Sequence, residues 1–255
     1  MTVYAVALSK GGSTKTTTAA ELVAALARRG RRVLAIDLDQ QGNLSRRMGL
    51  TDSTEVSAVA ADVLTAEATA IEAAVPAASV PGADVLVGTH DLADLDQQPE
   101  VITSLRDHLP EVAGEWDDVV IDTPPALGLV TLAALAAADV VVAALVCQTE
   151  AYDQLGRLVQ VIDRRVTRMK RDQRLHWIVP TRHDRRRLLD RDVIDTLEKE
   201  YPGRVTTPVR EAVAAADAYT ARMPVSVYDP ESPVARDYAA AMTQIIGTPE
   251  PDAAD

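Results

Sequence analysis

The chain has 255 residues, of which 47% are hydrophobic and only 3% aromatic, and its formal net charge is −12. This length allows one α/β domain with a complete aliphatic core, and the single cysteine, Cys147, excludes a disulfide framework and a Cys-x-x-Cys metal or cluster site. No signal peptide precedes Val3 and no apolar run reaches membrane-spanning length, so we expect a cytoplasmic protein without a membrane partner.

Short apolar runs alternate with helical patterns along the chain. Strands are expected at 3–8, 33–37, 84–87, 118–122, 140–146 and 175–180. Helices are expected at 16–29, 99–109, 127–137 and 151–167, and the stretch 56–83 is expected to be a helix followed by a loop. The alternation predicts an α/β fold, a mostly parallel twisted sheet with helices on both faces. We expect one domain over 1–247 and a disordered acidic tail over 248–255, which has two prolines and three acids.

The segment between the first expected strand and the first expected helix reads Ser-Lys-Gly-Gly-Ser-Thr-Lys-Thr-Thr-Thr over residues 9–18. Backbone N–H groups and the dipole at a helix N-terminus favour phosphate oxygens, so this context predicts a phosphate-binding loop. In such a loop Lys15 would reach the outer phosphates of ATP, and the hydroxyl of Thr16 would bind Mg²⁺. The residues expected to bind the nucleotide are Lys10, Gly11, Gly12, Ser13, Thr14, Lys15, Thr16 and Thr17.

Thr14 departs from the usual loop, which has glycine before its lysine. Glycine tolerates unusual φ values, whereas threonine is β-branched and stiff. The loop therefore either follows the usual path at some cost or binds nucleotide more weakly.

Two acidic motifs each end an apolar run. The first is Asp37-Leu-Asp39-Gln-Gln-Gly-Asn43, and the second is Asp118-Val-Val-Ile-Asp122-Thr-Pro-Pro, which has the form of a Walker B strand. Open α/β sheets bind ligands at the carboxyl ends of their strands, and the terminal Walker B aspartate helps to hold Mg²⁺. We expect Thr16, Asp37 and Asp122 to form the magnesium site.

Positive charge gathers in one part of the chain. Residues 151–191 contain 12 Lys or Arg and 5 Asp or Glu, a net charge of +7 in a chain of −12. Such asymmetry predicts one face for an anionic partner such as DNA, although two solvated helix ends with surface arginines are the alternative. The residues that this charge leads us to expect at DNA are Arg164, Arg165, Arg168, Lys170, Arg171, Arg182, Arg185, Arg186 and Arg187.

Four motifs together resemble the ParA/MinD group of deviant Walker ATPases and, within it, the ParA partition ATPases, over residues 3–246. Lys10 matches the group's signature lysine in K-G-G-x-x-K-[ST], and the motif that begins at Asp37 matches D-x-D-P-Q-G-N except that Gln40 replaces proline. Asp122-Thr-Pro-Pro matches the Walker B region. Residues 224–232 resemble the family's closing strand and loop.

This resemblance implies an ATP-dependent homodimer in which Lys10 reaches the partner subunit's nucleotide. It further implies non-specific binding of double-stranded DNA, association with the nucleoid in the ATP state, and a ParB-like protein that stimulates hydrolysis. The catalytic residues would be Lys10, Lys15, Asp37 and Asp39, with Asp39 positioning the attacking water and Asp37 supporting Mg²⁺, or the reverse. Arg186 falls on the family's T-x-x-D-x-R pattern. The resemblance adds Arg210 to the expected DNA contacts, as at best a displaced match to the first arginine of the family's I-P-R-N-V-R pattern. No second arginine is evident in the site, so hydrolysis should be slow without a partner.

Two alternatives remain open at this point. A MinD-like membrane-cycling ATPase shares the nucleotide motifs, but it would end in a basic amphipathic helix, whereas this chain ends in an acidic, proline-broken segment. An ATP-binding scaffold that positions a protein cargo with little hydrolysis is also compatible with Thr14 and Gln40. A turnover assay separates the second alternative from an ATPase cycle.

Overall fold

The structure is a computed structural model that describes residues 1–9, 12 and 14–247. The predictions made for Lys10, Gly11, Ser13 and the tail 248–255 lie outside the described residues and stay predictions. Within the described residues, a seven-stranded sheet has the order β3-β4-β2-β5-β1-β6-β7, and every neighbouring pair is parallel except β3 and β4. The strands are β1 (Thr2–Val6), β2 (Val33–Asp37), β3 (Val75–Pro76), β4 (Ala83–Leu86), β5 (Asp118–Asp122), β6 (Val140–Val146) and β7 (Trp177–Thr181).

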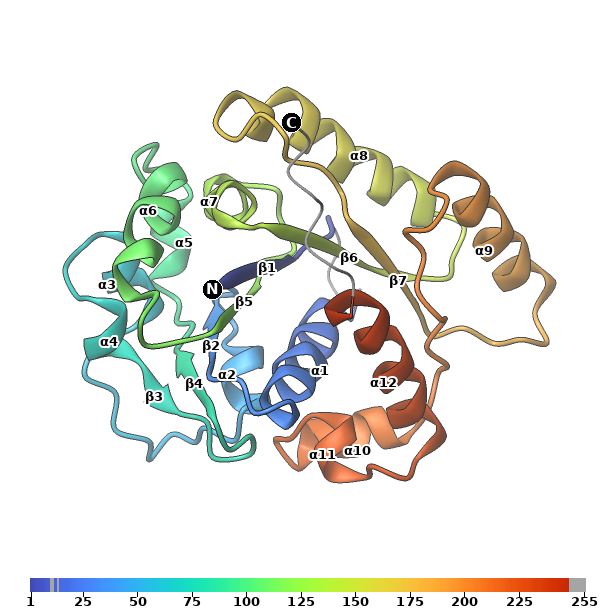
Figure 1. Cartoon of the computed structure of the whole chain (residues 1–255), viewed down its shortest axis with the longest axis horizontal. Coiled ribbons are helices and arrows are strands. Elements are labelled where there is room, and N and C mark those ends of the chain that lie inside the picture. The colour runs from blue at the N-terminus through green and yellow to red at the C-terminus, as the bar shows by residue number, and fades with distance from the viewer. Residues whose placement is uncertain (10–11, 13, 248–255) are drawn as a thin grey trace.

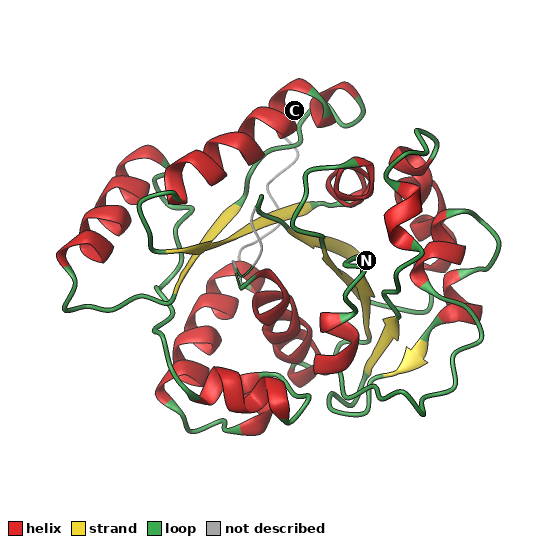
Figure 2. Ribbon diagram, turned by 180° about the vertical axis from the view of Figure 1, so that it is seen from behind, coloured by secondary structure: helices red, strands yellow, loops and turns green. Residues whose placement is uncertain are grey.

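Helices cover both faces of this sheet, as Figures 1 and 2 show. One face carries α1 (Lys15–Arg28), α2 (Asn43–Arg47), α10 (Ala214–Thr220), α11 (Val225–Tyr228) and α12 (Pro233–Ile246). The other carries α3 (Ala60–Leu64), α4 (Ala70–Ala73), α5 (Leu92–Leu95), α6 (Val101–His108), α7 (Leu129–Ala137), α8 (Ala151–Arg164) and α9 (Leu188–Glu200), with short 3-10 helices at Leu109–Val112 and Val166–Arg168.

The sheet separates two aliphatic cores, one under each layer of helices. Its central strands are rich in valine and buried on both faces, as parallel strands in α/β proteins are. The predicted α/β class and mostly parallel sheet are thereby confirmed. Among the helices of the described residues, none is long and apolar enough to cross a bilayer.

The structure corrects the sequence prediction at two places. The stretch 56–83 contains α3, α4 and the two-residue edge strand β3 rather than one helix and a loop. The predicted closing strand at 224–228 is wrong, because this segment forms the short helix α11. It packs on α1 instead of joining the sheet, where the backbone N–H of Ser226 donates to the buried carboxylate of Glu21 at 3.2 Å.

Candidate nucleotide-binding site

The predicted phosphate-binding loop lies at the carboxyl edge of the sheet. The chain leaves β1 there and enters α1 at Lys15. A cavity of about 240 Å³ opens over the start of α1. Its lining includes the predicted residues Gly12, Thr14, Lys15, Thr16, Thr17 and Asp39.

Lys15 is the cation at the base of this cavity. Only 6% of the residue is exposed. Burial lowers the pKa of its ammonium group, and the nearby carboxylates of Asp122 and Asp39 act in the opposite direction. A buried ammonium beside a helix N-terminus suits a phosphate oxyanion.

The two acids after β2 have different surroundings. Asp37 is fully buried, and its Oδ2 accepts hydrogen bonds from the backbone N–H and the hydroxyl of Ser45, each at 2.8 Å. Its Oδ1 accepts from the backbone N–H of Asp39 at 3.2 Å, so this carboxylate holds the loop against α2. Asp39 is half-buried and lines the cavity, where its Oδ1 accepts from the N–H of Gln41 at 3.0 Å. Of the two acids, Asp39 is the one that lines the cavity.

Asp122 ends β5, directly beside Asp37 in the parallel register. It is fully buried, and the hydroxyl of Thr16 is the donor close to its carboxylate, whose two oxygens have no hydrogen bond of good geometry within the described residues. Burial, reinforced by repulsion from Asp37, raises the pKa of Asp122 to about 8, and burial raises that of Asp37 to about 6.

The residues around Asp122 could coordinate a Mg²⁺ ion together with the nucleotide. The buried carboxylate of Asp122, whose oxygens have no hydrogen bond of good geometry, and the nearby hydroxyl of Thr16 are suited to a hard cation. The described residues contain no group of three or more His, Cys, Asp or Glu side chains that could hold a metal ion by themselves. Phosphate oxygens and waters would therefore complete the coordination, which is the usual pattern for Mg²⁺.

Gly88 supports the acidic loop from behind and was not predicted. It lies just beyond β4, and its N–H donates to the hydroxyl of Ser45 at 3.2 Å. A Cβ atom at this position would lie 2.7 Å from the carbonyl oxygen of Asp39 and 2.8 Å from the carboxylate carbon of Asp37. Only glycine permits so close an approach. The signal was present in the sequence, as a glycine directly after the apolar run 85–87.

Thr14 occupies the left-handed region, with φ of 65°, directly before α1. A β-branched residue there costs about 1–2 kcal/mol. At this position the backbone therefore has the conformation that glycine would favour. The Oγ1 of Thr14 lies 2.7 Å from that of Thr181, and Thr181 donates to the carbonyl oxygen of Leu145 at 2.9 Å. Since the hydroxyl hydrogen of Thr181 is used in that bond, Thr14 is the donor, and this bond offsets part of the strain.

The sequence prediction that no further arginine is evident in the site is wrong. Arg47 from α2 and Arg182 after β7 both line the cavity, together with Asn43, Pro125 and Tyr219. Arg47 is a charged residue on the otherwise apolar helical stripe that includes Leu44 and Met48, and this pattern could have identified it. Arg182 had been assigned only to DNA.

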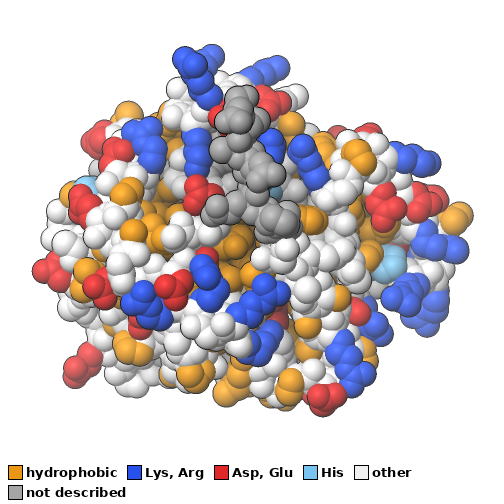
Figure 3. Space-filling model, viewed as in Figure 1, with side chains coloured by type: hydrophobic (Ala, Val, Ile, Leu, Met, Phe, Trp, Pro, Cys, Tyr) orange, Lys and Arg blue, Asp and Glu red, His pale blue; other side chains and the backbone are white. Residues whose placement is uncertain are grey.

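The basic residues do not form one face, contrary to the prediction. α8 and β7 run in opposite directions, and α8, with 14 residues, is about 21 Å long. These elements place the two runs of arginine at opposite edges of the sheet. The amino-edge cluster is Arg164, Arg165, Arg168, Lys170, Arg171 and Arg174, and the carboxyl-edge cluster is Arg182, Arg185, Arg186, Arg187 and Arg191. Figure 3 shows Lys and Arg side chains both at its upper margin, where α8 ends in Figure 1, and at its right-hand margin, near α9.

Some of these side chains already have intramolecular partners. Lys170 donates to the carbonyl oxygen of Ala138 at 2.7 Å and pairs with Asp139 at 3.0 Å, so it fastens the end of α7. Arg210 pairs with Asp237 of α12. Arg186 makes two bonds of 3.0 Å to Asp184 while 90% of its side chain stays exposed.

Comparison with known proteins agrees with this site. A family model described as an AAA domain matches residues 1–175. The chain is 36% identical over 234 residues to the chromosome partitioning protein ParA of Caulobacter vibrioides, which covers 89% of this chain and 87% of that protein. It is 31% identical to a Mycobacterium smegmatis structure named cobyrinic acid a,c-diamide synthase with bound ADP and magnesium, with a TM-score of 0.72 over 86% of this chain and 91% of that one. Apo McdA of Cyanothece shares the fold, with 20% identity and a TM-score of 0.84 over 97% and 100% of the two chains.

The parallel sheet, the loop before α1 and the acids that end β2 and β5 define a P-loop ATPase. Within that class, the family-model match and the similarity to the Caulobacter protein show that the chain belongs to the ParA family of partition ATPases. The predicted resemblance and the ATPase activity are thereby confirmed.

Proposed function

We propose that ATP binding assembles this protein into a sandwich homodimer that binds double-stranded DNA without sequence preference, and that a ParB-like partner releases it by stimulating hydrolysis. The supporting observation is the position of the carboxyl-edge cluster. Its first member, Arg182, lines the nucleotide cavity and follows Thr181, which holds the phosphate-binding loop through Thr14. The nucleotide contacts and the DNA contacts thus lie at the same edge of the sheet. Because they are close together, association with the nucleoid would depend on ATP.

The site residues divide the chemistry between them. Lys15 and the N–H groups at the start of α1 bind the phosphates of ATP. Thr16 and Asp122 would hold Mg²⁺, which would supply positive charge to the bound phosphates. Asp39 faces the cavity and orients the attacking water, while Asp37 fixes the loop that carries Asp39.

Lys10 has a separate role in this proposal. It lies outside the described residues, and its assignment rests on the loop sequence alone. We place it against the partner subunit's nucleotide, where it makes dimer formation depend on ATP.

DNA retention tests the proposal with a matched pair of variants. The Arg185/Arg186/Arg187→Ala variant removes three charges from the carboxyl-edge cluster, and Arg164/Arg165/Arg168→Ala removes three from the amino-edge cluster. Retention of the full chain is measured without nucleotide, with ADP and with ATP–Mg²⁺, at two salt concentrations. We expect retention only with ATP–Mg²⁺, and we expect the first variant alone to lower the slope of log affinity against log salt by about 2–3.

Several results would count against this function. If both variants lost DNA retention equally, the carboxyl-edge cluster would have no special role in DNA binding. If the protein retained DNA equally with ADP and with ATP, DNA binding would not depend on the nucleotide state. DNA retention with ATP but no measurable turnover, with or without a partner, would favour the ATP-bound scaffold instead.

A further inference from the structure

Arg47 is a buried cation at the nucleotide cavity. It is the last residue of α2, 7% of it is exposed, and it contributes to the lining of the cavity. Its Nε and one terminal nitrogen, Nη1, are buried without a hydrogen-bond partner. The guanidinium carbon lies 4.9 Å from the ring centroid of Tyr219, whose hydroxyl donates to Asn43 at 2.9 Å. The side chain therefore stacks on Tyr219, while Nε and Nη1 remain without an acceptor.

This arrangement is costly in the nucleotide-free protein. A buried charged donor without an acceptor loses the hydrogen bonds it would make to water. Burial lowers the pKa of Arg47, yet arginine stays protonated in proteins. Among the ion pairs of residues 1–9, 12 and 14–247, none joins Arg47 to a carboxylate.

Glu21 is the alternative group that could balance the buried charge of Arg47. It lies on α1, 1% exposed, close enough to act on Arg47 electrostatically. However, the Oε1 of Glu21 accepts from Ser226, and its Oε2 is buried without a hydrogen bond to Arg47. Glu21 therefore supplies no hydrogen bond to the guanidinium of Arg47, and an anion that enters the cavity could supply one.

We infer that Arg47 is a nucleotide-binding residue of this chain, whose guanidinium donates to a phosphate oxygen of the bound nucleotide. The inference rests on the proposed nucleotide site and deepens it. A phosphate matches the charge and the adjacent donors of arginine better than the neutral nitrogens of a base do. Thr16 and Thr17, which begin α1, line the same cavity, so the helix N-terminus and Arg47 both favour negative charge there.

The test compares three variants of the full chain. Arg47→Met keeps a similar apolar volume without charge, Arg47→Lys keeps the charge, and Glu21→Gln alters the buried neighbour. Affinities for Mg²⁺–ATP, Mg²⁺–ADP, inorganic pyrophosphate and adenosine are measured by calorimetry. Arg47→Met should weaken the first three by about ten- to hundredfold, as expected for charge-assisted hydrogen bonds, and adenosine binding should not change. Arg47→Lys should recover part of the loss, and Glu21→Gln should resemble the unaltered protein.

Thermal unfolding separates binding from folding. Without nucleotide, Arg47→Met should unfold at the same or a higher temperature than the unaltered protein, because an unsatisfied buried charge is removed. The rise in unfolding temperature caused by Mg²⁺–ATP should shrink in this variant.

Three outcomes would overturn the inference. The first is unchanged affinity of Arg47→Met for pyrophosphate and ATP. If Lys15→Ala has lost ATP binding in the same assay, this result rejects the role of Arg47 and leaves the proposed nucleotide site standing. A strongly lowered unfolding temperature without nucleotide, together with equal loss of affinity in Glu21→Gln, would show a structural role. A loss of affinity for adenosine alone would show that Arg47 contacts the nucleoside and not a phosphate. If Lys15→Ala also binds ATP normally, the proposed function itself fails.

Discussion

Two aspartates on one strand, Asp118 and Asp122, show how differently the two edges of the sheet use charge. They begin and end β5, and at most 1% of either is exposed. Asp118, at the amino edge, accepts hydrogen bonds from Nε and Nη2 of Arg31. Asp122, at the carboxyl edge, has no arginine partner among the described residues, and the hydroxyl of Thr16 is the donor close to it.

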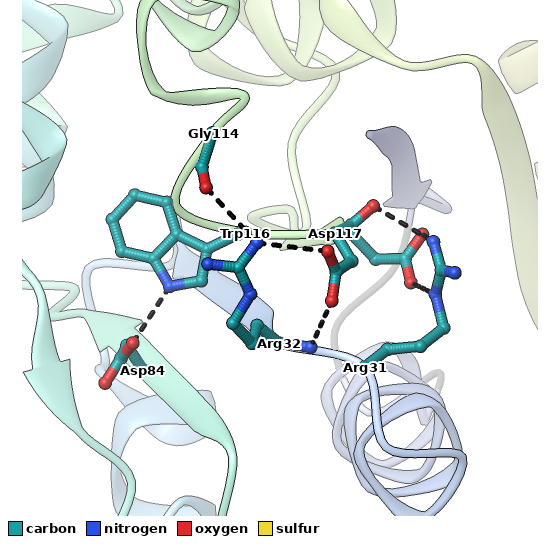
Figure 4. A network of polar contacts seen from close by, with 7 residues as sticks. Arg31, Arg32, Asp84, Gly114, Trp116 and Asp117 are labelled. Atoms are coloured by element: carbon teal, nitrogen blue, oxygen red, sulfur yellow. Dashed lines mark hydrogen bonds and ion pairs between the residues drawn. The ribbon is translucent and has the colours of Figure 1, made fainter.

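The neighbours of each aspartate extend this contrast. At the amino edge, Arg32 bonds Asp117 and the carbonyl oxygen of Gly114, and the indole N–H of Trp116 donates to Asp84 at 2.9 Å (Figure 4). At the carboxyl edge, the unsatisfied carboxylate of Asp122 and the unsatisfied donors of Arg47 remain. On this strand, the aspartate paired with arginine holds the fold, whereas Asp122 lies where a ligand could complete its bonding.

The largest difference should appear in turnover. Replacing Asp39, the acid that faces the cavity, by alanine should lower kcat by about 10²–10⁴, because the water loses its orienting acceptor. ATP binding and stability should change little. Single-turnover hydrolysis and ATP titration measure the two quantities, and a fully active Asp39→Ala enzyme would transfer this role to Asp37.

Arg31→Met should have the opposite profile. It leaves the buried carboxylate of Asp118 without its arginine, which should lower the free energy of unfolding by about 2–4 kcal/mol, less than for a fully buried pair because Arg31 is partly exposed. ATP turnover per folded molecule should be unaffected. Denaturant unfolding gives the first value, and loss of turnover without loss of stability would break the contrast between the edges.

Asp122 should make the nucleotide-free protein less stable as pH rises. Its pKa is about 8 in the folded chain, that of Asp37 about 6, and an unfolded aspartate titrates near 4. Between about pH 4 and about pH 8 the unfolded chain releases protons that the folded chain keeps, so these groups lower the free energy of unfolding as pH increases. Asp122→Asn should flatten this dependence and stabilise the protein near pH 8 by about 1–3 kcal/mol.

Denaturant unfolding at about pH 5 and about pH 8 checks this sign. The same variant should bind Mg²⁺–ATP more weakly, because a carboxylate is lost from the magnesium site. If Asp122→Asn were instead less stable near pH 8, the carboxylate of Asp122 would stabilise the fold, as that of Asp118 does.

Thr14→Gly should have the smallest effect. Glycine removes the left-handed strain but also removes the bond to Thr181, and these contributions nearly cancel, leaving a stability change of less than about 1 kcal/mol. ATP affinity, measured by titration, should change less than about fivefold. A loss of a hundredfold would instead show that the bond to Thr181 orders the loop.

Local patterns predicted the parts of the molecule that local chemistry determines. The apolar runs gave six strands of the parallel sheet, and the order of loop, Asp37 and Asp122 indicated which strand ends meet. The two-residue strand β3 has too little pattern to be visible, and α11 depends on packing against α1 rather than on its own sequence. Valine and tyrosine favour a strand there, so tertiary contacts overrode propensity.

The candidate site follows the same rule. Residues within one motif, such as Lys15 and Thr16, could be assigned from spacing, because a single turn positions them. Arg47 and Tyr219 come from segments more than 170 residues apart, and no spacing connects them. Likewise, the charge run gave the sign of the two basic clusters but not their separation, which depends on the direction of α8 and β7.

The close contact of Gly88 with the acidic loop limits how that loop can move. Gly88 lies so near the backbone of Asp37 and Asp39 that not even a methyl group fits between them. The acidic loop therefore has no room to move toward the end of β4, and any adjustment that a ligand causes must take another direction.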